Sequence, residues 1–184
     1  VHDTGEDRTA SHGITFGASN HCTMSKIGVL GTGMVGKVLA SGFLKYGHEV
    51  MIATRDPNKV ADWLDKHPEG RVGSHHEMGA WADLIVLSSK GTAAEAAIGL
   101  CRAGDLEGKT IIDTTNPIAD AAPTNGVLHY FTTLEESLME RLQRAVPKAH
   151  FVKAFNSVGN AYMVDPYFKG VKPTMFICGN NDEA

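Results

Sequence analysis

The chain has 184 residues, of which 42% are hydrophobic, and it carries a formal net charge of −4 at pH 7. This length and apolar content suffice for one folded domain, and the negative charge argues against a nucleic-acid or anionic-membrane partner. The three cysteines, Cys22, Cys101 and Cys178, are odd in number and far apart, which favours a reducing, cytoplasmic location over a disulfide framework or a zinc site.

The first 23 residues are polar, rich in Gly, Ser, Thr and His, and without hydrophobic periodicity. They are expected to form a disordered or cloning-derived extension, and residues 24–184 are expected to form the folded domain. Neither a signal peptide nor an apolar membrane span is expected from the sequence.

A glycine-rich turn follows the first predicted strand. Residues 26–36 pass from an apolar run into three glycines and then into a segment with helical periodicity. In this order, the first glycine suits the turn, the second lets the main chain approach a dinucleotide pyrophosphate, and the third lets the helix pack on the strand. Amides at the start of the helix then face the anion. The residues predicted to bind here are Gly31, Thr32, Gly33, Met34, Val35 and Gly36.

The context of the turn indicates a βαβ unit. Apolar residues at helical spacing continue to residue 44, Gly47 is placed to end the helix, and residues 49–53 form a second apolar run. Strand, turn, helix and strand together span about 30 residues, which is the context that the dinucleotide motif requires.

The residues after the second strand distinguish NADP from NAD. NAD-binding units usually carry Asp or Glu there, whose carboxylate holds the ribose 2′-hydroxyl. Here Thr54 and Arg55 follow the strand, and Lys59 comes one helical turn into a helix begun by Pro57. These side chains suit the charge of a 2′-phosphate, which a carboxylate would repel. We therefore expect NADP, with a solvated loop as the alternative, and we expect Asp56 to cap the helix.

Strands and helices continue to alternate along the chain. Residues 84–87 are continuously apolar, as in a parallel strand covered on both faces. The alternation predicts an α/β fold, specifically a Rossmann-like, doubly wound and mostly parallel sheet. Leu134, Leu138, Met139 and Leu142 are expected to form the apolar stripe of one helix. The further predicted strands are 71–74, 83–88, 109–114, 150–155 and 174–178, and the helices are 59–66, 77–82, 93–101, 133–145 and a short one near Ala161.

Residues that follow the later strands are further binding candidates, because ligands of open α/β sheets lie outside the carboxyl ends of the strands. Hydroxyls and amides there could hydrogen-bond the nicotinamide ribose and carboxamide, and Pro117 or Val158 could cover the ring. Turn chemistry explains Ser88 and Asn116 equally well. The candidates are Ser88, Ser89, Asn116, Pro117 and Asn156.

The triplet His75, His76 and Glu77 could suggest a metal or a proton-transfer site. A surface turn is the favoured interpretation, because neighbouring side chains on a strand point to opposite faces. No catalytic or metal-binding residue is assigned.

The sequence resembles the NADPH-dependent reductases of the deazaflavin coenzyme F420. The resemblance covers nearly all of the chain from Met24 onward and lies in residues 30–37 (Leu-Gly-Thr-Gly-Met-Val-Gly-Lys), 54–59, 153–158 (Lys-Ala-Phe-Asn-Ser-Val) and 175–181. It implies that Thr32 contacts the pyrophosphate or its ribose, and that Thr54, Arg55 and Lys59 bind the 2′-phosphate. It also implies a deazaflavin pocket that uses the segment at Asn156 and a portion after residue 184. The reductase domains of six-transmembrane metalloreductases look similar over the same stretches.

The resemblance implies direct hydride transfer between NADP and coenzyme F420 or a related acceptor, so the expected partners are a small-molecule cofactor and a redox acceptor. A homodimer is a further expectation for the assembly. Two alternatives remain open. One is an NADPH-dependent enzyme of the β-hydroxyacid dehydrogenase or imine-reductase type, and the other is a non-catalytic NADP-binding sensor or partner domain. Residues 179–184 look like the start of a helix, so we expect a continuation that this sequence lacks.

Overall fold

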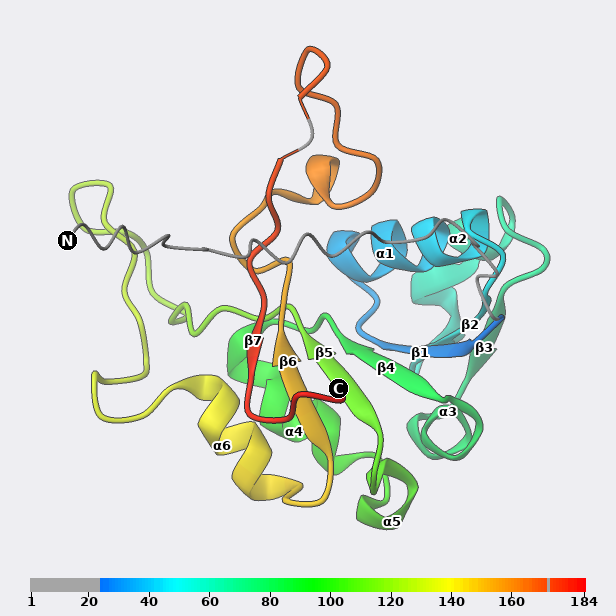
Figure 1. The fold of residues 1–184 in the computed structure, drawn as a ribbon, viewed down its shortest axis with the longest axis horizontal. Helices are drawn as coiled ribbons and strands as arrows, with labels where there is room; N and C mark the ends of the chain where they lie inside the picture. Colours follow the sequence, from blue (N-terminus) through cyan, green and yellow to red (C-terminus); the bar gives the residue numbers. More distant parts are fainter. Residues whose placement is uncertain (1–23, 172) are drawn as a thin grey trace, which may run out of the picture.

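The computed structural model describes residues 24–171 and 173–184, so the extension predicted at residues 1–23 lies outside the described residues. A seven-stranded sheet in the order β3-β2-β1-β4-β5-β6-β7 forms the centre of the molecule (Figure 1). The first six strands are parallel, and β7 is antiparallel to β6. This sheet confirms the predicted Rossmann-like α/β fold. The strands are β1 (Lys26–Leu30), β2 (Glu49–Ala53), β3 (Arg71–Gly73), β4 (Leu84–Leu87), β5 (Thr110–Asp113), β6 (His150–Lys153) and β7 (Cys178–Gly179).

Helices cover both faces of the sheet (Figure 1). On one face lie α1 (Met34–Lys45) and α2 (Ala61–Leu64), and on the other lie α3 (His75–Trp81), α4 (Ala94–Gly99), α5 (Ala103–Leu106) and α6 (Leu138–Ala145). The described residues also form three short 3-10 helices: η1 (Pro57–Val60), η2 (Gly91–Ala93) and η3 (Asn160–Tyr162). Within the described residues, no helix is both long and apolar enough to cross a membrane.

Each face of the sheet packs on its own hydrophobic core. Leu39 of α1 and Trp63 of α2 pack with Val29 and Ile52 on one face. Met78, Ile98 and Leu142 come from three helices on the other face and pack with Ile85 and Phe151 of the sheet. Because the central strands are buried on both sides, their sequences are continuously apolar and do not alternate.

The first helix ends as its sequence predicts. Gly47 has a φ of +83°, which L side chains rarely adopt. Its N–H donates to Leu44 O at 2.9 Å, and His48 N–H donates to Phe43 O at 3.1 Å. This pair of bonds is a Schellman motif, which satisfies free carbonyls and turns the chain back towards β2.

The helix predicted at residues 133–145 is shorter than expected. It begins after Ser137, whose hydroxyl accepts the Glu140 N–H at 3.2 Å while the Glu140 carboxylate accepts the Ser137 N–H at 2.6 Å. This capping box satisfies donors that the helix would otherwise leave free, so the helix starts there. Leu134 is therefore not part of the apolar stripe, and its side chain is fully exposed.

The interpretation of His75, His76 and Glu77 as a surface turn is wrong, because these residues open α3. Ser74 accepts the Glu77 N–H at 3.1 Å, and the Glu77 carboxylate accepts the Ser74 N–H at 2.8 Å, so a second capping box starts this helix. The strand predicted at residues 174–178 is also shorter. Only Cys178–Gly179 pairs with β6, and the side chains of Phe176 and Ile177 are exposed.

A buried ion pair joins the carboxyl ends of β5 and β6. Lys153 Nζ donates to Asp113 Oδ2 at 2.6 Å and to Thr115 O at 2.8 Å. The fully buried Asp113 also accepts the Thr115 N–H at 2.9 Å and the Thr115 hydroxyl at 2.7 Å. These bonds fix the start of the loop after β5.

Replacing Lys153 by Met should destabilise the fold by about 3 kcal/mol, because it leaves the Asp113 carboxylate buried without its cation. Lys148→Met is the matched control, since the Lys148 ammonium bonds Glu107 at 2.7 Å on the surface and its loss should cost under about 0.5 kcal/mol. Denaturant unfolding of both variants measures the difference. Equal losses of stability would contradict this role of the buried pair.

Candidate functional site

A cavity of about 380 Å³ opens at the carboxyl ends of β1, β2 and β4. It brings together residues from three predicted segments that lie far apart in the sequence. The predicted site residues that line it are Gly31, Thr32, Gly33, Thr54, Arg55, Lys59, Ser88 and Ser89.

Two of the three motif glycines are required by packing within the protein. Gly31 has a φ of +143°, and a Cβ there would lie 2.7 Å from the carbonyl oxygen of Ser88. A Cβ on Gly36 would lie 2.2 Å from Gly31 O, so α1 can approach β1 only without a side chain at this position. Both contacts are with backbone atoms, which cannot move aside cheaply.

Gly33 is different, because the protein itself does not require a glycine there. Its φ is −78°, and a Cβ would meet no described atom within 4 Å. Gly33 caps α1 and lines the cavity, so the missing side chain leaves open space in front of the first amides of the helix. That space fits the close approach of a pyrophosphate to the main chain.

The Thr54 hydroxyl shapes the loop that carries Arg55. It donates to Asp56 O at 3.0 Å and accepts the Asp56 N–H at 3.0 Å. The Asp56 carboxylate accepts the Asn58 N–H at 3.1 Å, which confirms the predicted cap of the helix begun by Pro57. Thr54 thus holds the turn from which Arg55 reaches the cavity.

Arg55 and Lys59 provide positive charge at the cavity. Both residues are exposed, both line the cavity, and neither forms an ion pair with another described residue. Lys90 also lines it, but its ammonium is paired with Asp120. Two cations without a protein counter-ion at one end of a cavity suit an anion with more than one negative charge.

His75 also lines the cavity, although it was given no site role from the sequence. Its place follows from the pairing of β2 with β3, in which Ala53 lies opposite Gly73. Arg55 and His75 each stand two residues past these partners, so the register brings them to the same edge. Burial, and secondly the charge of Arg55, hold the pKa of His75 below its usual value. Its position just after a predicted strand was the signal available in the sequence.

Ser88 and Ser89 have different roles. The Ser88 N–H and hydroxyl both donate to Leu30 O, at 2.8 and 3.3 Å, so Ser88 ties β4 to β1. The Ser89 Oγ is buried at the cavity and has no hydrogen-bond partner among the described residues. A buried hydroxyl without a partner is costly in a protein interior, and a polar ligand in the cavity can supply the missing bond.

Asn116 and Asn156 lie outside this cavity and contact each other. Asn116 Nδ2 donates to Asn156 O at 2.8 Å, and Asn156 Nδ2 lies 3.4 Å from Asn116 Oδ1. Phe155, just before Asn156, has a φ of +61°, a strained conformation for an aromatic residue that costs about 1–3 kcal/mol. Strain of this size is held in place by its surroundings, here at the carboxyl end of β6.

The other predicted residues have mainly structural surroundings. Met34 is exposed at the start of α1, and Val35 packs against the core on that face of the sheet. Pro117 O accepts the Phe131 N–H at 3.0 Å. Val158 lines a second cavity of about 480 Å³, which is mostly apolar and also contains Phe155, Tyr162 and Met175.

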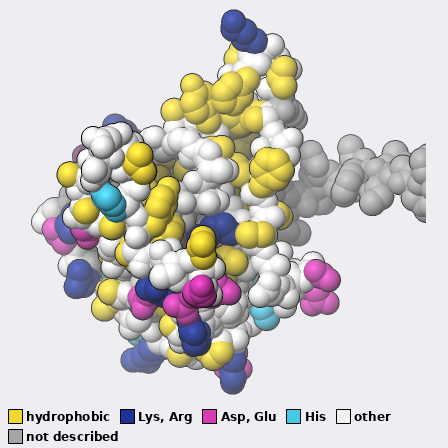
Figure 2. Space-filling view, turned by 90° about the vertical axis from the view of Figure 1, so that its left-hand side faces the viewer, with side chains coloured by type: hydrophobic (Ala, Val, Ile, Leu, Met, Phe, Trp, Pro, Cys, Tyr) yellow, Lys and Arg dark blue, Asp and Glu magenta, His cyan; other side chains and the backbone are white. Residues whose placement is uncertain are grey.

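The segment beyond β6 presents hydrophobic side chains to the surface. Figure 2 shows them gathered on the part of the chain that protrudes from the domain. Tyr162 and Phe168 stack there with ring centroids 4.8 Å apart, and both are partly exposed. Tyr167 and Val171 of the same segment are exposed as well.

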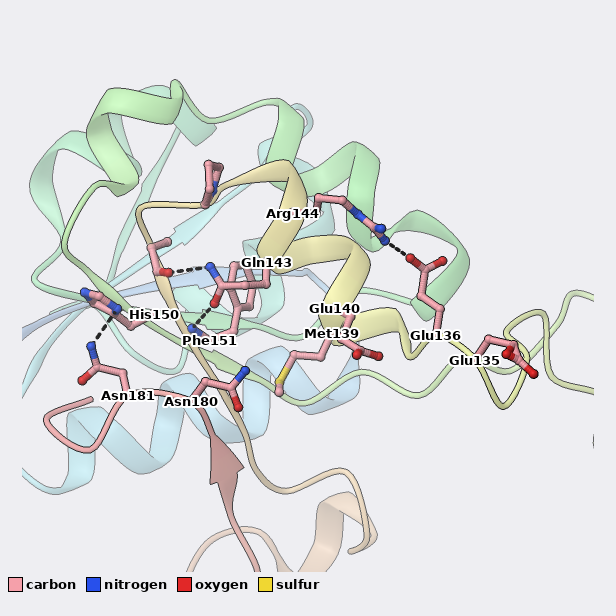
Figure 3. Close-up of a pocket in the computed structure, with 12 residues that line it drawn as sticks. Glu135, Glu136, Met139, Glu140, Gln143, Arg144, His150, Phe151, Asn180 and Asn181 are labelled. Atoms are coloured by element: carbon pink, nitrogen blue, oxygen red, sulfur yellow. Dashed lines mark hydrogen bonds and ion pairs between the residues drawn. The ribbon is translucent and has the colours of Figure 1, made fainter.

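A larger cavity, of about 590 Å³, lies between α6, β6 and β7 (Figure 3). It opens near His150, at the amino end of β6, and contains none of the predicted site residues. Several of its polar side chains already bind each other or the backbone: Gln143 donates to Ala149 O at 2.8 Å, and Asn181 pairs with His150 at 3.0 Å (Figure 3). We therefore assign the site to the smaller cavity.

Comparison with known proteins identifies a family and related folds. Residues 26–117 match the family model described as "NADP oxidoreductase coenzyme F420-dependent". A candidate F420-dependent NADP reductase from Arthrobacter sp. FB24 is 33% identical, with a TM-score of 0.80 over 86% of this chain and 75% of that one. No curated protein matches the sequence significantly.

More distant structures share the fold. A hypothetical protein from Sinorhizobium meliloti is 22% identical, with a TM-score of 0.73 over 89% of this chain and 77% of that one. A reductive aminase from Aspergillus terreus, in complex with NADPH and ethyl levulinate, is 19% identical with a TM-score of 0.57. The match to the aminase covers 79% of this chain but only 45% of that enzyme.

Alanine substitutions of Gly36 and Gly33 should affect different properties of the protein. Gly36→Ala should destabilise the fold by about 2–3 kcal/mol, because its Cβ would clash with the backbone of the turn. Gly33→Ala should cost about 1 kcal/mol or less but should weaken dinucleotide binding by about tenfold or more. Thermal unfolding and a binding titration check both variants. A Gly33→Ala protein that binds like the wild type would contradict the close approach.

Proposed function

This chain belongs to the family of coenzyme F420-dependent NADP oxidoreductases, and we propose that it transfers a hydride between NADP and a deazaflavin of the coenzyme F420 type. It is an NADP-dependent oxidoreductase with a Rossmann-type fold. The deazaflavin as acceptor is suggested by the family's name. The observation that carries the choice of cofactor is the pair Arg55 and Lys59, whose charges have no counter-ion among the described residues at the cavity.

The order of the strands supports one direction for the dinucleotide. The cations stand at the end of β2, the glycine turn at the end of β1, and Ser89 after β4. A 2′-phosphate beside Arg55 and a pyrophosphate at Gly33 would direct the nicotinamide towards β4, β5 and β6. The side chains of Asn116 and Asn156 lie along that direction.

The wall of the cavity formed by α4 fits a flat ring. The residues facing the cavity from this helix and its flanks are small or apolar, whereas Arg55 lies on the side of β2. An adenine could therefore lie between the apolar wall and a planar guanidinium, which packs well on aromatic faces. The wall consists of Ala93, Ala96, Ala97 and Leu100.

The proposed chemistry needs orientation more than acid or base catalysis. NADPH supplies a hydride from nicotinamide C4 to an acceptor ring held against it. The bonded pair of Asn116 and Asn156 would orient the carboxamide end, and the apolar cavity around Phe155 and Val158 would accommodate an aromatic acceptor and exclude water. The surroundings hold Phe155 at its strained φ of +61°, which sets the backbone direction just before Asn156.

The cofactor preference can be tested separately from the reaction. NADPH should bind more tightly than NADH, and Arg55→Ala should remove about 1.5–3 kcal/mol of that difference, because it removes a charge-assisted contact to the phosphate. Arg144→Ala is the control, since Arg144 lies on α6 and is paired with Glu136. Equal affinities of the unmodified protein for NADPH and NADH would contradict the assignment.

The acceptor is tested by following NADPH oxidation with a deazaflavin, a flavin and a set of imines and ketones. Turnover with the deazaflavin, and none or little with the other compounds, is the expected result. Turnover with the imines or ketones alone would instead support an enzyme of the imine-reductase type, whose fold this chain shares. Tight NADPH binding without any turnover would support a sensor or partner domain.

A further inference from the structure

His75 is the titratable side chain of the cavity that the proposed function leaves without a role. It lines the same cavity as Arg55 and Lys59 and is partly buried. Thr54 N–H donates to Gly73 O at 3.0 Å, so the loop that carries Arg55 is bound to the end of β3, two residues before His75. This bond holds the backbone segments that carry Arg55 and His75 next to each other.

We propose that His75 is a third side chain of the 2′-phosphate subsite and takes up a proton when the phosphate binds beside Arg55. This inference rests on the proposed binding of NADP. If His75 takes up this proton, the preference for NADP over NAD depends on pH. Arg55 and Lys59 contribute to the same preference with charges that do not change near neutral pH.

The charges around His75 explain why its protonation should follow the ligand. Burial and the nearby Arg55 lower the pKa of His75, so its ring is neutral near pH 7 in the free protein. A phosphate near −2 would offset Arg55 and stabilise the imidazolium, which raises the pKa again. The ionisable groups around it are Arg55, Asp56 and Lys59 from the loop after β2, Lys90 after β4, His76 and Glu77 on α3, and Cys101 and Asp105 beyond α4.

These ionisable groups compete little with His75 for the proton that is taken up on binding. Glu77 caps α3 through Ser74, and Asp105 binds Nδ1 of His76 at 2.7 Å. The Cys101 thiol donates to His75 O at 3.5 Å, and burial raises its pKa to about 11, so it stays neutral. Asp56 is the remaining acid at the cavity, and its carboxylate caps η1.

The direction of the pH effect follows from linkage. A group whose pKa is raised by a ligand strengthens binding fully below its pKa in the free protein. The effect is lost as the pH rises through its pKa in the complex. The phosphate itself titrates near pH 6, so the wild type must be compared with a variant that differs only at His75.

The experiment measures binding of 2′,5′-ADP and 5′-AMP to the full chain by calorimetry, in buffers of different ionisation enthalpy. His75→Gln keeps an N–H donor but cannot take up a proton. It should bind 2′,5′-ADP about tenfold more weakly than the wild type at about pH 6 and within about twofold at about pH 8. It should also take up fewer protons on binding, and 5′-AMP binding should not change. His76→Gln, the adjacent histidine bonded to Asp105, should behave like the wild type.

Other outcomes would overturn the inference. Equal loss of 2′,5′-ADP and 5′-AMP binding would place His75 at the base instead of the phosphate, and unchanged binding and proton uptake would leave it no role. If His75→Gln and His75→Asn do not fold, NMR titration of the wild-type ring decides, because its pKa must rise when 2′,5′-ADP is added. A wild type that binds both ligands equally would contradict the proposed NADP site itself.

Discussion

The close contact between the start of α1 and the ends of β1 and β4 determines the rest of this structure. Gly31, Gly36 and Ser88 meet there with backbone and hydroxyl atoms so near that a Cβ on either glycine would overlap them. The contact fixes where the first turn of α1 points, and therefore where its free amides meet a ligand. Gly33 lies in the same turn, but a Cβ there would meet no described atom within 4 Å. The turn is therefore tightly packed at Gly31 and Gly36 and leaves space for a ligand at Gly33.

The parallel register of the sheet then distributes charge along one edge. The residues that follow each parallel strand lie at the same edge of the sheet, so Arg55, His75 and Ser89 line one cavity although their strands are separated in sequence. The acids near this edge are used elsewhere: Asp56 caps a helix, and Asp120 pairs with Lys90. The positive charge of Arg55 and Lys59 is not paired with these acids, and we propose that this imbalance favours NADP.

Local signals in the sequence predicted most of the fold. Apolar runs marked the buried strands, and Gly47 marked the end of α1 because a positive φ there needs glycine. The prediction of an element or a site residue failed where a capping interaction or a strand pairing outweighed the local sequence pattern. Hydrophobic spacing extended one helix to Leu134, but the capping box at Ser137 starts it later. His75 was not assigned to the site, although it follows a predicted strand, because its place beside Arg55 depends on the pairing of β2 with β3.

A crystal structure of the protein with NADP bound tests the central claim most directly. The account predicts the pyrophosphate at the amides after Gly33, the 2′-phosphate within hydrogen-bond distance of the Arg55 guanidinium and the Lys59 ammonium, and the nicotinamide near Asn116 and Asn156. A 2′-phosphate that points into solvent, or a dinucleotide bound outside the cavity at the ends of β1, β2 and β4, would contradict it.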